Sequence, residues 1–204
     1  GTDDSNTWRM TEGTITGFGG TSAMTFTNMN AFTGGAGTDT LYGVGGDWNL
    51  TGSKAGSHNS ISFTGMDSLY GSSTLANTFN MTGNFAGAID GNGGDNTLDY
   101  SSYDADLSVS LAAGTSNLVS GWANIKTFKG NSDKANTLTG PSTGTHTWTL
   151  SDYSDGNVDT TYYFEDFQTL TAGAGSTDTL VGTGDSNTWR MTEGTITGFG
   201  GTSA

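Results

Sequence analysis

Short runs of alternating polar and apolar residues recur along the chain and are separated by segments rich in glycine, serine and asparagine. In the run 7–11, Trp8 and Met10 fall on one side, and the polar residues beside them fall on the other. The run 107–111, LSVSL, alternates in the same way. Successive side chains of a strand point to opposite faces, so these runs predict half-buried β-strands. Amphipathic helices are not expected, because no long stretch has a 3.6-residue apolar period.

Many of the predicted strands share one signature, in which a polar residue is followed by threonine and then by a large apolar residue. Glycine and asparagine between the runs supply the positive φ that tight corners require. The pattern predicts an all-β fold, a parallel β-solenoid in which each coil stacks its apolar residues on the coil below. The signature occurs at Asn6-Thr7-Trp8, Asp39-Thr40-Leu41, Asn77-Thr78-Phe79, Asn96-Thr97-Leu98, Asn136-Thr137-Leu138, His146-Thr147-Trp148, Asp178-Thr179-Leu180 and Asn187-Thr188-Trp189. We expect the stacked core to contain Trp8, Trp48, Phe79, Trp148, Trp189, Phe26, Phe63 and Phe164.

A string of β-sandwich domains, each of about 100 residues, is the alternative fold. Sandwiches usually have longer strands, more leucine and valine, and more proline in their loops than the single proline of this chain. The solenoid is therefore the favoured prediction.

The end of the chain repeats its beginning: residues 182–204 match residues 1–23, with Gly184 in place of Asp3 as the single difference. Trp189 and Arg190 thus correspond to Trp8 and Arg9. We therefore interpret residues 1–181 as one period of a continuous solenoid and residues 182–204 as the start of the next. Coils of roughly 20 residues would divide this period into about nine coils, and a spacing of ~4.8 Å would give it a length of about 43 Å.

Composition and charge narrow the function classes. The chain has 34 glycines, and its 11% aromatic residues supply apolar surface that a disordered linker lacks. Its net charge is −14, with six basic residues, so neither nucleic acid nor an anionic membrane surface is expected as a partner. There is no cysteine, which excludes disulfides and thiol chemistry. No apolar run approaches the ~18 residues that a membrane-spanning helix needs.

The segment 34–42, GGAGTDTLY, resembles the glycine-rich nonapeptide of the RTX, or haemolysin-type, calcium-binding repeats. The segments 94–101 and 107–111, and Asn124-Ile125 ahead of Gly130, are similar to the filamentous-adhesin-like repeats of large secreted bacterial surface proteins. The resemblance implies a parallel β-roll or β-solenoid that is exported from a bacterium. It also implies a secreted, extracellular or cell-surface location and a role in adhesion, surface coats or extracellular matrix.

In the RTX family, calcium lies between consecutive nonapeptide turns and is bound by an aspartate carboxylate and glycine carbonyls. Here the nonapeptides are scattered rather than tandem, and Asn96 and Asn136 stand where aspartate would bind. We therefore interpret these positions chiefly as turn residues, with no required cofactor and with calcium as an optional ligand. The metal candidates are Asp39 with the carbonyls of Gly35 and Gly37, followed by Asp95 and Asp178.

Catalysis has little support in the sequence. His58 and His146 lie in unrelated contexts, and no known catalytic motif is present. A polysaccharide-cleaving β-helix enzyme is the alternative, and its carboxylates would come from the local cluster of Asp152, Asp155, Asp159, Glu165 and Asp166. Because near-identical tandem repeats are typical of mechanical or multivalent use, we expect the chain not to be an enzyme.

The predicted function is the structural shaft of a bacterial extracellular filament, adhesin or matrix fibre, supplying length, stiffness and surface attachment. Its partners would be further copies of itself, through tandem repeats or end-to-end stacking, with lateral bundling and a cell surface or polysaccharide as further contacts. The alternatives are an RTX-like calcium-binding module and a repetitive surface that binds ice or polysaccharide. The threonine pairs that such a surface would use do not recur at a constant interval; they are Thr14-Ile15-Thr16, Thr25-Phe26-Thr27, Thr38-Asp39-Thr40 and Thr147-Trp148-Thr149.

Overall fold

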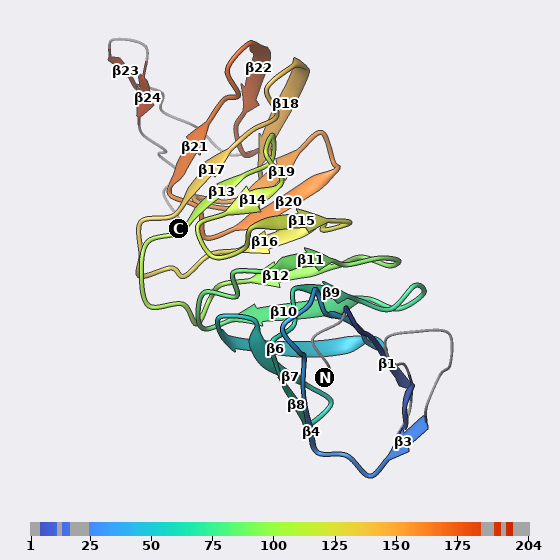
Figure 1. The fold of residues 1–204 in the computed structure, drawn as a ribbon. Helices are drawn as coiled ribbons and strands as arrows, with labels where there is room; N and C mark the ends of the chain where they lie inside the picture. Colours follow the sequence, from blue (N-terminus) through green and yellow to red (C-terminus); the bar gives the residue numbers. More distant parts are fainter. Residues whose placement is uncertain (1–4, 12–13, 17–24, 185–189, 193–194, 198–204) are drawn as a thin grey trace.

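The chain folds as an all-β solenoid of about five turns, whose coils stack along one axis from β3 and β4 at one end to β22 at the other (Figure 1). The computed structural model describes residues 5–11, 14–16, 25–184, 190–192 and 195–197. No helix in this part of the chain is long and apolar enough to cross a membrane. The parallel β-solenoid predicted from the sequence is confirmed, and the tandem-sandwich alternative does not describe the chain.

The described strands form three large sheets and one separate hairpin. Sheet A has the order β15 (Gly121–Ala123), β11 (Ala88–Asp90), β9 (Ser68–Tyr70), β5 (Thr40–Tyr42), β1 (Thr7–Thr11), β2 (Thr14–Thr16) and β3 (Thr25–Thr27). Sheet B has the order β22 (Ser176–Val181), β18 (Gly144–Leu150), β19 (Gly156–Val158), β20 (Tyr162–Glu165), β16 (Thr127–Lys129), β12 (Thr97–Asp99), β10 (Asn77–Met81), β6 (Gly46–Gly52), β7 (Ala55–His58), β8 (Ile61–Thr64) and β4 (Ala31–Thr33). Sheet C has the order β14 (Thr115–Ser116), β13 (Ser108–Ser110), β17 (Thr137–Thr139) and β21 (Thr169–Thr171), and the hairpin is β23 (Arg190–Thr192) with β24 (Thr195–Thr197).

Parallel pairing in register stacks one apolar residue of each coil on the next. In sheet B, Phe79 lies between Trp48 and Leu98, and in sheet A, Leu41 lies between Trp8 and Leu69. The Trp48 and Phe79 rings stack with centroids 5.5 Å apart. The polar residue ahead of each of these points the other way; it is threonine except at Asp47 and Ser68. The alternation therefore sets both the register and the buried face.

The structure places the expected core residues as follows. Trp8, Trp48, Phe63, Phe79, Trp148 and Phe164 are buried, Phe26 is partly buried against the same core, and Trp189 lies outside the described residues.

The expectation of about nine coils of roughly 20 residues each is wrong, because the solenoid has about five turns and its coils differ in length. The step along the chain from Phe79 to the residue stacked on it, Leu98, is about half as long as the step from Phe128 to Phe164. The short step is a plain coil. The long step contains an antiparallel meander, which lengthens the coil without adding a turn to the solenoid.

Three such meanders occur among the described residues, and the first strand of each contains a tryptophan: β1-β2-β3, β6-β7-β8 and β18-β19-β20. In the second and third, the first two strands pair in the same register: Trp48 lies opposite His58, and Trp148 lies opposite Val158. The loop into the last strand is one residue longer in the third meander, which adds Thr161. In both, this loop contains two residues with positive φ, as type I′ turns require. These residues are Asn59 and Ser60 (φ 49° and 64°) and Asp159 and Thr160 (φ 53° and 56°).

A glycine in the middle strand of each of these two meanders allows the sheet to pack closely. A Cβ added to Gly56 would lie 2.9 Å from the Phe63 ring and 2.4 Å from the Asn49 carbonyl oxygen. At Gly156 the corresponding distances are 2.9 Å to the Phe164 ring and 2.3 Å to a carbonyl oxygen. The two meanders are therefore copies of one structural unit, although few of their residues are identical.

Candidate functional site

The most regular chemical feature of the solenoid is a set of buried polar side chains at its corners. Each of them is the polar residue that begins the signature, at the start of a strand or immediately ahead of it. Asn6, Asp39, Asn77, Asn96 and Asn136 are all at most 1% exposed. A buried polar group is costly unless it is hydrogen-bonded, so the partners of these side chains decide what the corners do.

Asn77 and Asn96 occupy successive coils and bond directly to each other. The Asn96 Oδ1 accepts from the Asn77 backbone N–H (2.9 Å) and from its Nδ2 (2.8 Å). The Asn96 Nδ2 donates to the carbonyls of Gly93 (3.1 Å), Gly94 (3.2 Å) and Asn124 (2.9 Å). An amide suits this position because it donates on one side and accepts on the other.

Asp39 is surrounded by N–H donors. Its Oδ1 accepts from the backbone N–H (3.1 Å) and the Nδ2 (2.7 Å) of Asn6, and its Oδ2 accepts from the Gly35 N–H (2.8 Å). Gly35 thus presents its N–H to the carboxylate, and Gly37 lies in the same turn. The carboxylate joins its own turn to the preceding coil, which contains Asn6.

Asp67 continues this corner into the next coil, and the sequence analysis did not single it out. Its Oδ2 accepts from the Asp39 backbone N–H (2.9 Å), and its Oδ1 pairs with the Lys54 ammonium. Burial raises the pKa of Asp67, but the hydrogen bonds from Lys54 and Asp39 outweigh this and hold the pKa below its ordinary value. Asp67 lies directly ahead of β9, and this position before a strand could have identified it in the sequence as a corner residue.

The other two metal candidates lie on different elements and have other partners. Asp95 precedes β12 and forms an ion pair with Lys126 (3.0 Å). Asp178 lies in β22, where it accepts from the Trp148 Nε1 (2.8 Å) and from the Ser176 hydroxyl. Over the described ranges, no group of three or more His, Asp or Glu side chains is arranged to hold a metal ion.

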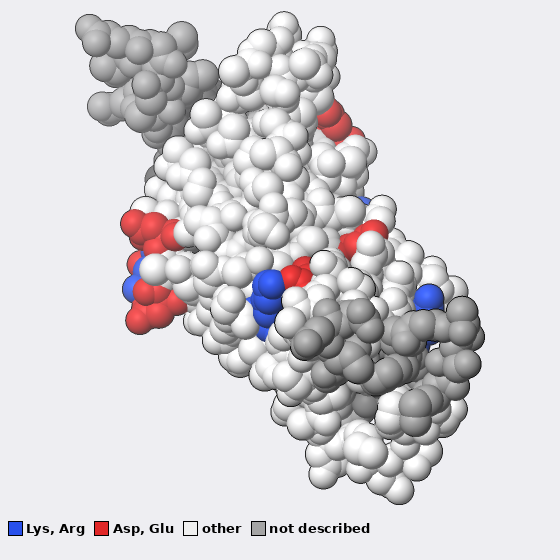
Figure 2. Space-filling view, in the orientation of Figure 1, with Lys and Arg blue, Asp and Glu red and all other residues white. Residues whose placement is uncertain are grey.

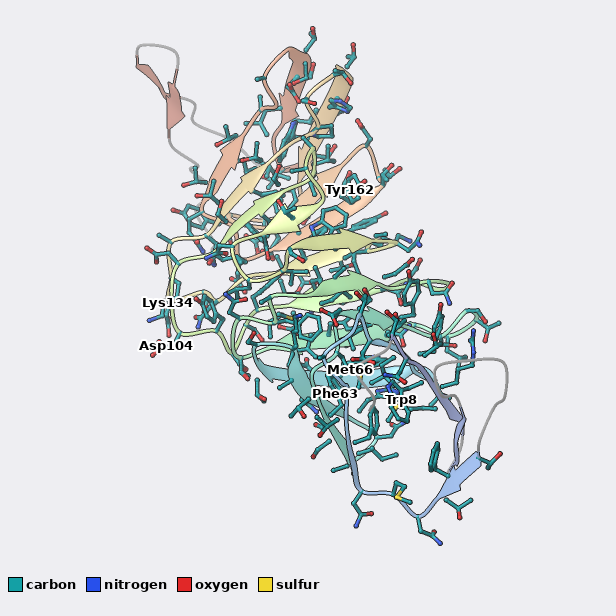
Figure 3. The ribbon with its side chains drawn as sticks, viewed as in Figure 1. Trp8, Phe63, Met66, Asp104, Lys134 and Tyr162 are labelled. Carbon is teal, nitrogen blue, oxygen red and sulfur yellow. The ribbon has the colours of Figure 1, made fainter. Side chains whose placement is uncertain are left out.

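Lysine–carboxylate pairs connect neighbouring coils on the outside. Lys126 pairs with Asp95, Lys129 with Glu165 (2.7 Å) and Lys134 with Asp104 (2.6 Å), the last at one margin of the molecule (Figure 3). Figure 2 shows that charged side chains occupy few places on this face. Such exposed pairs contribute little to stability, because water screens them. The lysines therefore join coils and do not gather into a basic patch in the described part of the chain.

The carboxylates of the alternative enzyme site bond to separate partners. Asp159 accepts from the Thr147 N–H (2.7 Å) and pairs with His146 (2.6 Å). The Asp155 Oδ1 accepts from the backbone N–H of Asp166 (2.8 Å). Burial, followed by repulsion from nearby carboxylates, raises the pKa of Asp166. Glu165 pairs with Lys129, and Asp152 accepts from the Tyr153 N–H (2.7 Å).

The two histidines differ in environment. His58 is fully buried and stacks on Trp48 with ring centroids 4.1 Å apart. Its Nδ1 donates to the Asp47 carbonyl (3.0 Å), and its Nε2 accepts from the Val44 N–H (3.3 Å), which fixes a neutral tautomer. Burial lowers the pKa of His58, against the opposing effect of the bond to the Asp47 carbonyl. His146 lies outside the core, and its hydrogen bond to Asp159 raises its pKa.

Replacing His58 with valine is expected to remove a loss of stability at acidic pH. The folded pKa of His58 is lowered, so below about pH 6.5 the unfolded chain binds a proton that the folded chain does not, and stability falls as the pH falls. Valine is the matched replacement because Val158 occupies the equivalent position opposite Trp148. Urea unfolding of both proteins between about pH 8 and about pH 5 measures the difference.

In that comparison, the stability of the original protein relative to the valine variant should fall towards acidic pH. His146 titrates in both proteins, so its opposite contribution cancels: its raised pKa gives stability at low pH that is lost as the pH rises. A difference that stays constant over the range would show that His58 does not titrate in this way.

At the two ends of the solenoid, core residues are only partly covered. Phe26 in β3 and Phe32 in β4 lie at one end, and Leu170 in β21 and Leu180 in β22 lie at the other. All four point in the same direction as the buried residues of their sheets and pack against the core. The sequence analysis missed Phe32, Leu170 and Leu180 as core residues. It also missed Gln168, whose Oε1 accepts from the Asn136 N–H (2.9 Å).

Comparison of the chain with protein-family models, with curated proteins and with solved structures finds no match in any of the three. The functional argument therefore rests on the chain's own geometry.

Proposed function

We propose that this chain is shaft material of a bacterial extracellular filament, adhesin or matrix fibre, in which repeated coils supply length and stiffness. Its apolar core runs from coil to coil along the axis, and its buried polar side chains form hydrogen bonds between neighbouring coils. Its lysines likewise pair across coils. These features support a mechanical role more directly than a catalytic one. The resemblance to bacterial surface repeats is the basis for the extracellular location.

One observation carries the proposal: the first two strands of the repeated sequence pair in the same register in both copies. In β1 and β2, Arg9 lies opposite Thr16 and Met10 opposite Ile15. In β23 and β24, Arg190 lies opposite Thr197 and Met191 opposite Ile196, which is the same register in the second copy of the sequence. A sequence that restarts its structure after one period is suited to continue along the same axis.

Chains that contain residues 1–181 once, twice or four times in tandem are expected to form rods whose length grows in proportion to the number of periods. Each added period should extend the same core and leave the diameter unchanged. Electron microscopy and small-angle scattering measure both dimensions. Separate beads, or a diameter that grows with the number of periods, would contradict the proposal.

A further inference from the structure

At the two ends of the solenoid, four described strands each have a neighbour on one side only. β3 ends sheet A and β4 ends sheet B at the first end of the solenoid, and β21 ends sheet C and β22 ends sheet B at the other. Each of the four has a partly buried apolar residue: Phe26, Phe32, Leu170 and Leu180, respectively. The inner strands carry fully buried residues at the matching positions, such as Phe63 in β8. Each end therefore lacks a covering layer among the described strands.

The meanders β6-β7-β8 and β18-β19-β20 show how a covering layer is built. In each, the third strand pairs in parallel with the strand two places before the tryptophan strand: β8 on β4, and β20 on β16. The strand after the meander pairs with the strand immediately before the tryptophan strand: β9 on β5, and β21 on β17. Both meanders, although far apart in the sequence, follow the same two-part rule.

The same rule assigns partners to the end strands when a second copy follows the first. The tryptophan strand of that copy is its β1, and the two strands ahead of it are β22 and β21 of the first copy. The rule therefore places β3 of the second copy on β21, and β4 of the second copy on β22. The joint therefore uses the four strands that lie at the two ends of the solenoid.

The chain lengths agree with this assignment. When residue 1 of a second copy follows residue 181 of the first, the step from Leu170 to Phe26 is one residue longer than the step from Phe128 to Phe164. The step from Leu180 to Phe32 of the second copy is likewise one residue longer than the equivalent step from Leu138 to Leu170. The joint therefore has almost the same length of connecting chain as the pairs around β18-β19-β20, and it is five or six residues longer than the pairs around β6-β7-β8.

The side chains at this joint are compatible as well. In register, Thr25 and Thr27 of the second copy would lie beside Thr169 and Thr171 of the first. None of the four is charged, so no like charges meet. Trp8 would strengthen the joint, because its ring already packs on Phe26 (6.1 Å) and would hold it against the first copy.

We propose that successive copies join through two parallel strand pairs, with Phe26 of one copy stacked on Leu170 of the copy before it and Phe32 stacked on Leu180. The inference rests on the proposed shaft function and adds its partner, a second copy of this sequence, and the register of the contact.

The test uses a two-copy chain, residues 1–181 followed by residues 1–204, with one cysteine in each copy. Thr171→Cys in the first copy and Thr27→Cys in the second should form a disulfide on mild oxidation, because the chain has no cysteine of its own to compete. Thr33→Cys with Thr64→Cys within one copy is the positive control, since these residues are in-register neighbours whose Oγ1 atoms are 3.0 Å apart. Thr27→Cys with Thr171→Cys, both in the second copy, is the negative control.

Disulfide formation at the joint to the same extent as in the positive control supports the proposed register. Absence of that disulfide while the positive control forms would overturn it. If the two-copy chain is a rod of doubled length but lacks the disulfide, the shaft function stands and only this register fails. If the length does not double, the shaft function itself fails.

A second variant checks the joint without cysteines. Leu170→Asp in the first copy should lower the urea midpoint of the two-copy chain more than the same change in the second copy, where Leu170 lies at an open end. Equal shifts in the two copies would overturn the proposal.

Discussion

Replacing Trp48 with alanine should lower the free energy of unfolding by about 3–5 kcal/mol, the range found for truncation of buried aromatic residues. Trp48 is fully buried in the middle of the sheet B ladder. Its ring stacks on Phe79 (5.5 Å) and His58 (4.1 Å) and meets Phe63 edge-on (6.0 Å). Alanine would remove all three contacts at once and leave a cavity that the surrounding strands can close only in part.

The surroundings of Trp48 leave little freedom to collapse. A Cβ added to Gly43 would lie 2.2 Å from the indole, so the backbone of the corner already touches the ring. Urea unfolding followed by circular dichroism measures the loss, because fluorescence would change with the tryptophan itself. Tyr153→Ala is the control: Tyr153 is 68% exposed, and its replacement should change stability by less than about 0.5 kcal/mol. Similar effects of the two substitutions would show that Trp48 is not part of a packed interior.

The strands and their inward faces could be predicted because both depend on local sequence. Alternation in a run such as 7–11 identifies its buried side without knowledge of any neighbour. The coil lengths depend on a choice that local sequence does not express. The turn at Asn59-Ser60 reverses the chain as a hairpin, whereas the corner at Gly71 leads on to the next face of the coil. Both appear in the sequence as polar breaks between strands, and the pairing partners of the flanking strands distinguish them.

The sequences of β6-β7-β8 and β18-β19-β20, compared with each other, do indicate the inserted meanders. Trp48 and Trp148 are each followed two positions later by leucine. Six positions after each leucine comes a glycine, Gly56 or Gly156. The spacing is the same although most of the intervening residues differ. The tryptophans drew attention to the buried positions, but only the recurrence of the whole unit reveals an inserted meander.

At the corners, too, the sequence predicts the position of a polar residue but not all of its partners. The nonapeptide resemblance drew attention to Asp39, but it could not say which atoms would face the carboxylate. One donor, the Gly35 N–H, comes from the same turn, and the other two come from Asn6 in the preceding coil, through the register of β1 on β5. The surroundings of a corner residue thus depend partly on the neighbouring coil, and the sequence of one turn does not contain that part.

Replacing Asn96 with alanine should destabilise the protein by about 3 kcal/mol or more, since several buried polar groups lose their partner together. The Asn77 N–H loses its acceptor, and the carbonyls of Gly93, Gly94 and Asn124 lose a shared donor. Asn80→Ala is the control, because the Asn80 side chain makes one exposed contact, to Asn49 (3.3 Å). Urea unfolding should separate the two variants clearly, and equal losses would mean that water replaces the Asn96 contacts.

Asn96→Asp tests the chemistry of the corner rather than its volume. An aspartate has the shape of asparagine, but its second oxygen would face three carbonyl acceptors in place of a donor. The ionised form is therefore disfavoured in the folded state, and the folded pKa of the new carboxyl should lie above its unfolded value. The folded state then holds its proton to higher pH, so stability should improve as the pH falls through the folded pKa.

Asp39→Asn is the reciprocal change and should behave differently. Asp39 accepts three hydrogen bonds from N–H groups, and an asparagine would turn its NH₂ towards at least one of them. This variant should be destabilised without the recovery at acidic pH that Asn96→Asp shows, because it adds no carboxyl. Recovery at acidic pH in Asn96→Asp but not in Asp39→Asn would establish that each corner is matched in polarity to the coil beside it. Recovery at acidic pH in neither variant would mean that the corners tolerate either side chain and that stacking of the apolar core alone sets the register.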